Sequence, residues 1–138
     1  MLIAWGFSVL ALLFGAGLGA RALLDPRWAQ RFVRLQPDEQ GGGFAEFRAT
    51  YGGVFLGLHA AALLLALRYL LAGGALIGVI AAGAVAVLSA GWAGSAFGRF
   101  VSVLRDKSDT KFNRISIVAE LLIAAAIGAP WFVWLVTG

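Results

Sequence analysis

The sequence contains no cysteine and a single histidine, His59. The first absence excludes disulfides, thiolate metal sites and thiol catalysis, and the second excludes a metal centre built from several histidines. Charge is also scarce, because only 13% of the residues are Asp, Glu, Lys or Arg, against roughly 25% in ordinary soluble domains. A chain that is 61% hydrophobic cannot cover a surface that faces water. We therefore expect lipid to cover most of this protein, and we expect no metal or cofactor.

Four long apolar runs dominate the sequence, at about residues 2–24, 44–71, 75–97 and 115–136. Each reaches the roughly 20 residues that a helix needs to cross the hydrocarbon core of a bilayer. The runs are continuous, whereas strands of a membrane barrel alternate in polarity, so helices are expected. We predict an all-α membrane protein, a single domain over residues 1–138 that forms a bundle of four transmembrane helices.

A short amphipathic helix is predicted after the first run, at about residues 26–35. Asp25 is a favourable N-cap and Pro26 suits the first turn, and the glycines and proline of 36–43 are expected to end the helix. Three large apolar residues recur at helical spacing on one face, and three arginines recur on another. This pattern is typical of a helix that lies among lipid headgroups. The apolar residues are Trp28, Phe32 and Leu35, and the predicted headgroup contacts are Arg27, Arg31 and Arg34.

The distribution of Lys and Arg predicts the orientation in the membrane. Ten of the 11 basic residues border the first and third loops, and only Arg68 borders the short turn predicted at Gly73–Gly74. Because loops rich in Lys and Arg stay in the cytoplasm, we predict a bacterial inner-membrane protein with cytoplasmic basic loops and both termini in the periplasm. Trp131 and Trp134 are predicted to anchor the outer interface.

Ionisable groups gather at the predicted cytoplasmic ends of the helices. Glu120 lies slightly inside the fourth run, and Glu46 and Arg48 open the second run. Because an unpaired acid in lipid is costly, we expect Glu120 to face inward and to pair with Arg99 or Arg48. Two interpretations remain open. The pair either fixes the helices as a structural ion pair or lines a polar cavity on the cytoplasmic side that holds a headgroup, a quinone or a small anion.

His59 is expected near the middle of the membrane, either as a neutral residue bonded to a neighbouring helix or as part of a proton relay. No nucleophile lies beside it at recognisable spacing, so a hydrolase triad has no support. No catalytic residue is predicted. The candidate ligand-binding residues are Glu46, Arg48, Tyr51, His59, Arg99 and Glu120.

A motif at the start of the second run, with one arginine and one acid farther along the chain, carries a family resemblance. These residues read Glu46-x-Arg48-x-x-Tyr51-Gly52-Gly53, then Gly98-Arg99, then Glu120. Over nearly its whole length the chain resembles a bacterial family of small four-helix integral membrane proteins, a domain of unknown function, and it is more loosely similar to DoxX-like membrane proteins. The resemblance supplies no substrate. It implies that the positions to test first are Arg48, Tyr51, Gly52, Gly53, Arg99 and Glu120.

Three classes of function follow from these features. The first is a membrane protein that binds or transports a lipid-like or small amphipathic, hydrophobic ligand in the cytoplasmic-side cavity. The second is a structural or accessory subunit that docks another membrane protein or a second copy through glycine-rich helix faces, because small residues let helix backbones approach. An enzyme is the least supported, since no activated nucleophile or cofactor motif is present. Membrane lipids are expected partners, and nucleic acid is not.

Overall fold

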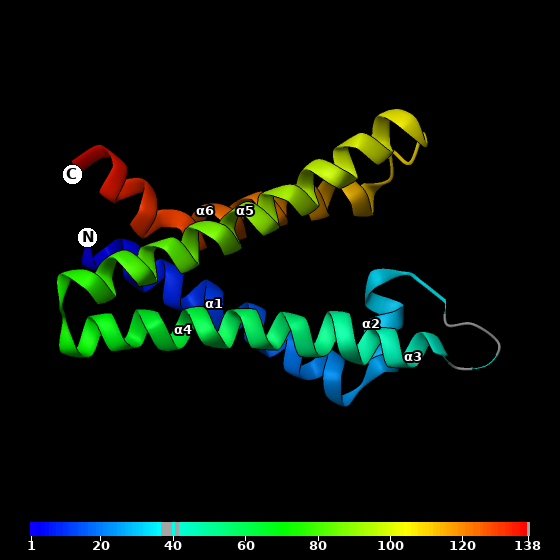
Figure 1. Cartoon of the computed structure of the whole chain (residues 1–138). Coiled ribbons are helices and arrows are strands. Elements are labelled where there is room, and N and C mark those ends of the chain that lie inside the picture. Colours follow the sequence, from blue (N-terminus) through cyan, green and yellow to red (C-terminus); the bar gives the residue numbers. More distant parts are fainter. Residues whose placement is uncertain (37–39, 41, 138) are drawn as a thin grey trace. The chain divides into compact units, whose positions relative to one another are not determined.

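A computed structural model describes residues 1–36, 40 and 42–137, and every regular element in these residues is helical (Figure 1). Part of the predicted 36–43 break lies outside the described residues. The elements are α1 (Leu2–Leu24), α2 (Pro26–Val33), α3 (Gly42–Glu46), the π-helix η1 (Phe47–Val54), α4 (Phe55–Ala72), α5 (Ala75–Arg105) and α6 (Lys111–Thr137).

Among the described residues, four helical stretches are long and apolar enough to cross a membrane. They are Leu2–Leu24, Gly42–Ala72, Ala75–Arg105 and Lys111–Thr137. The predicted all-α fold class is confirmed, and so is the short helix after the first span. The protein is a multi-pass integral membrane protein.

The last two long helices extend beyond their apolar runs. α5 continues past residue 97 to Arg105, and α6 begins at Lys111 rather than near residue 115. The long side chains of Arg and Lys can keep their charges at the membrane surface while their backbone stays helical. The apolar run therefore marks the part of each helix that needs lipid, not the whole helix.

The chain forms two compact units. Unit 1 comprises residues 1–11 and 65–138, and unit 2 comprises residues 12–64. In unit 1, α5 and α6 pack against each other, and Ser89 Oγ donates to the Ala124 carbonyl oxygen at 2.7 Å. α4 and α5 are joined at Gly73 and Gly74, whose φ angles of 67° and 98° suit glycine, so the predicted tight turn is confirmed.

In unit 2, the second half of α1 packs antiparallel to η1 and α4. A Cβ atom on Gly15 would meet the His59 ring, one on Gly19 would meet the Leu56 backbone, and one on Gly52 would lie 2.8 Å from the Leu23 Cα. Residue numbers rise along α1 and fall along α4 and η1 from one contact to the next, so the contacts define the antiparallel register of these helices.

The short helix α2 also belongs to unit 2. Its N-cap is confirmed, because the Asp25 side chain accepts a hydrogen bond from the Trp28 backbone N–H at 3.0 Å. Ala29 is buried against Phe47 of η1, whereas Phe32 stays exposed. One side of α2 therefore packs on the protein, and the Phe32 side is left for lipid. The helix ends at Val33, two residues before the predicted end.

Candidate functional site

Glu120 forms an ion pair between α6 and α5 with Arg99, one of its two predicted partners. Arg99 Nε donates to Glu120 Oε1 at 2.8 Å. Arg99 Nη1 donates to the Asn113 Oδ1 at 3.3 Å. The Glu120 side chain is 10% exposed and the Arg99 side chain 31%. We call these three residues the Arg99–Glu120 site.

The second carboxylate oxygen of Glu120 is the unusual feature of this site. Oε2 is buried and has no hydrogen-bond partner among the described residues. An unsatisfied buried acceptor costs roughly 1–3 kcal/mol, and more for a charged group. Arg99 reaches the carboxylate through one nitrogen instead of gripping both oxygens. The site therefore retains the capacity to accept one more hydrogen bond.

The site is braced by the loop between α5 and α6. The amide of Asn113 donates to the Ser108 carbonyl oxygen at 2.8 Å, and the Ser108 and Ser102 hydroxyls lie 2.9 Å apart. Because Asn113 also accepts from Arg99, the loop, the arginine and the acid form one connected network.

A second, exposed ion pair joins the same loop to the first turn of α6. Arg114 donates two hydrogen bonds to the Asp109 carboxylate, from Nε to Oδ1 at 2.6 Å and from Nη2 to Oδ2 at 2.5 Å. Hydrogen bonding to Arg114 holds the pKa of the Asp109 carboxyl below its ordinary value of 3.8. The pair faces water, so it is expected to add little stability.

Arg48 stands in a different setting, on the π-helix of unit 2. Its Nη1 donates to the carbonyl oxygen of Leu23, near the C-terminal end of α1. The last carbonyls of a helix lack partners within the helix and attract cations. Arg48 therefore caps α1, and Gly52, one turn farther, is buried against the same residue. The Arg-x-x-Tyr-Gly-Gly stretch thus holds the end of α1.

The other predicted residues of unit 2 are spread along η1 and α4. Glu46 is exposed, and Tyr51 is half-buried with its ring 5.8 Å from the Phe47 ring. His59 is 1% exposed. Its Nδ1 is hydrogen-bonded to the Phe55 carbonyl oxygen at 2.7 Å, within its own helix. Since a carbonyl only accepts, Nδ1 carries a proton.

The predicted candidates thus belong to two groups. Arg99 and Glu120 meet in unit 1, whereas Glu46, Arg48, Tyr51 and His59 belong to unit 2. The three arginines predicted to bind headgroups, Arg27, Arg31 and Arg34, are all exposed.

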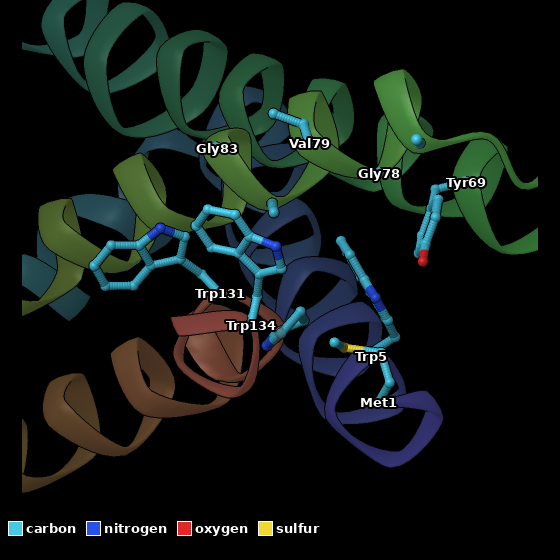
Figure 2. A pocket seen from close by; sticks show the side chains of 11 residues that line it. Met1, Trp5, Tyr69, Gly78, Val79, Gly83, Trp131 and Trp134 are labelled. Carbon is cyan, nitrogen blue, oxygen red and sulfur yellow. The ribbon is translucent and has the colours of Figure 1, made fainter. Parts of the chain in front are cut away.

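Sequence reasoning missed a cavity in unit 1, near the Gly73–Gly74 turn (Figure 2). Four aromatic side chains line it: Trp5, Tyr69, Trp131 and Trp134. The last two are predicted interface anchors. Nothing in the spacing of the four residues signals a common site, because they come from three helices far apart in the sequence.

No family model, no curated protein and no solved structure matches this chain. The family resemblance drawn from the motif residues is therefore supported only as an architecture, a membrane protein with four long apolar helices.

Proposed function

We propose that this membrane protein binds a lipid-like or small amphipathic ligand at the Arg99–Glu120 site, on the side of the membrane predicted to be cytoplasmic. The observation that supports the proposal is the buried Glu120 Oε2 without a partner among the described residues. A purely structural ion pair gains most when both carboxylate oxygens are bonded. Here one oxygen is left to accept a donor.

The ligand expected at this site carries a hydrogen-bond donor beside an acceptor. The donor would satisfy Glu120 Oε2. The acceptor would bind Arg99, whose guanidinium has five N–H groups and whose side chain is 31% exposed. A phosphoethanolamine headgroup combines these features, because its ammonium donates and its phosphate accepts. The hydrocarbon chains of such a lipid would lie along the exposed apolar face of the helices.

Native mass spectrometry of the purified protein tests the proposal with two lipids. Phosphatidylethanolamine and phosphatidylcholine share the phosphate and the net charge, but the trimethylammonium group of the second has no N–H to donate. A charge-assisted hydrogen bond contributes roughly 1.5–3 kcal/mol, so the protein is expected to prefer phosphatidylethanolamine by about tenfold or more.

Two variants show whether Glu120 sets this preference. Glu120→Gln keeps an oxygen for Arg99 but replaces the acceptor with an N–H group, so the preference is expected to disappear. Asp109→Asn removes the same charge in the exposed loop pair and should keep the preference. Equal binding of both lipids by the wild-type protein, or an undiminished preference in Glu120→Gln, would show that the site does not bind such a headgroup.

The alternative is a structural or accessory subunit that docks a membrane protein or a second copy. It has one observation in its favour. Gly91, Gly94 and Gly98 of α5 are exposed, and a Cβ atom on any of them would meet nothing within 4 Å. This face is open to a close helix–helix contact. In the same mass spectra, a dimer that Gly94→Leu disrupts, with no retained lipid, would favour the alternative.

A further inference from the structure

The cavity near the Gly73–Gly74 turn has a volume of about 380 Å³, within the range of roughly 300–1,000 Å³ typical of small-molecule sites. We call it the aromatic pocket. It is lined by Met1, Trp5, Tyr69, Ala75, Gly78, Val79, Ala82, Gly83, Pro130, Trp131 and Trp134, all of which belong to unit 1.

Small residues on the first turns of α5 leave the space for this pocket. A Cβ atom on Gly78 would lie 2.8 Å from Cε2 of Tyr69, so glycine is needed there to seat the ring. A Cβ atom on Gly83 would meet nothing within 4 Å, although Gly83 lines the pocket. The space beside Gly83 is therefore open.

The aromatic side chains of the pocket come from α1, α4 and α6. The Trp5 ring is tilted at 49° to the Tyr69 ring, with centroids 5.3 Å apart. Pro130 lies inside α6 directly before Trp131 and interrupts the helical hydrogen bonds there. Figure 2 shows Trp131 and Trp134 on α6 opposite the first turns of α5, and Trp5 beside Met1 on α1. Indole faces from two helices thus border one space.

The chemistry of the lining is specific. None of the lining residues has a charged side chain. Ring faces offer stacking to a planar group, and three indole N–H groups and one phenol are hydrogen-bond donors. Among the lining side chains the Tyr69 hydroxyl is the one strong acceptor, so donors outnumber acceptors. The walls therefore suit an uncharged planar ring that carries acceptor oxygens.

We propose that the aromatic pocket binds an uncharged aromatic ring bearing carbonyl oxygens, a quinone-type ring. The ring stacks on the face of one indole, and its carbonyl oxygens accept hydrogen bonds from the N–H group of another indole or from the Tyr69 hydroxyl. This site is independent of the proposed headgroup site, because Gly83 and Arg99 lie about 24 Å apart along α5 at 1.5 Å per residue.

Tryptophan fluorescence is a direct readout, since three of the five tryptophans line the pocket and quinones quench indole emission. The purified protein is titrated with 2-methyl-1,4-naphthoquinone, and the saturable part of the quenching is measured. The comparison compound is 2-methylnaphthalene, which has the same rings without carbonyl oxygens. The naphthoquinone is expected to bind at least tenfold more tightly than 2-methylnaphthalene. The affinity of 2-methylnaphthalene is measured by its competition with the naphthoquinone.

Two glycine variants of α5 form a matched pair. The Cβ atom of Gly83→Leu meets nothing within 4 Å, and the rest of the side chain occupies space in the pocket, so the variant is expected to weaken naphthoquinone binding at least tenfold. Gly91→Leu makes the same change on the same helix at a residue that does not line the pocket, and it should bind like the wild type. Circular dichroism of both variants tests whether they keep the helical fold of the wild type.

The proposal is overturned if the wild type shows no saturable quenching, or if Gly83→Leu and Gly91→Leu bind the naphthoquinone equally. Equal affinity for 2-methylnaphthalene would overturn the assigned role of the carbonyl oxygens. Aromatic cages also bind quaternary ammonium groups. The preference for an uncharged ring is therefore wrong if dodecyltrimethylammonium displaces the naphthoquinone with an affinity equal to that of the naphthoquinone itself.

Discussion

Gly52→Ala is expected to destabilise unit 2, whereas Gly53→Ala is not. A methyl group at position 52 would lie 2.8 Å from both the N and Cα atoms of Leu23, which are backbone atoms that cannot rotate away. Forcing an extra methyl group into a packed contact typically costs about 1–3 kcal/mol. At position 53 the nearest atom is the Arg48 carbonyl oxygen at 3.6 Å, an ordinary contact.

The two variants control for each other because both replace a helical glycine. The gain of roughly 0.5–1 kcal/mol from lower backbone entropy is common to both, so their difference isolates the clash and is expected at about 1–3 kcal/mol. Titration of SDS into the protein in mild detergent, followed by circular dichroism, gives the free energy of unfolding of each variant. Equal free energies for the two variants would refute the close packing of η1 on α1.

Three further predictions concern the two ion pairs and the orientation in the membrane. Arg99→Gln should destabilise the protein more than the double variant Arg99→Gln, Glu120→Gln. The single change leaves a buried carboxylate without a cation, which costs about 3–5 kcal/mol. SDS unfolding measures which of the two variants is less stable. The pKa of Asp109 is depressed, so its contribution to stability is present above the ordinary value of 3.8 and is lost as pH falls through the lower folded value. NMR titration should show the Asp109 pKa rising in Arg114→Gln. The Lys107→Cys variant should resist a membrane-impermeant maleimide in intact cells and react after permeabilisation. Labelling in intact cells would reverse the predicted orientation.

The four spans and the pairing of Glu120 with an arginine were predictable, because each follows from the properties of lipid. Twenty apolar residues need a hydrocarbon environment, and an acid among them needs a cation. Only Arg99 and Arg48 were candidates at a suitable depth. Choosing between them required the structure, which assigns Arg48 to the Leu23 carbonyl oxygen.

Other features have no signal in the sequence. The π-helix at Phe47–Val54 depends on a shift from i→i+4 to i→i+5 hydrogen bonds, which residue type alone does not specify. The aromatic pocket depends on Trp5, Tyr69 and Trp131 meeting from three helices. The polar cavity expected at the cytoplasmic side stays a proposal, and the cavity described above is instead aromatic and lined by no charged side chain.

One hydrogen bond has a consequence for how the chain assembles during synthesis. Ser8 Oγ donates to the Ile127 carbonyl oxygen at 2.8 Å, so a residue of the first helix binds one of the last. α1 enters the membrane long before α6 has been translated, and until then the Ser8 hydroxyl can bond only to its own helix or to transient partners. Unit 1 is therefore completed only after the final helix is inserted. A ribosome stalled before α6 should leave a membrane-inserted but loosely packed intermediate, whose first helix is open to crosslinking with the insertion machinery.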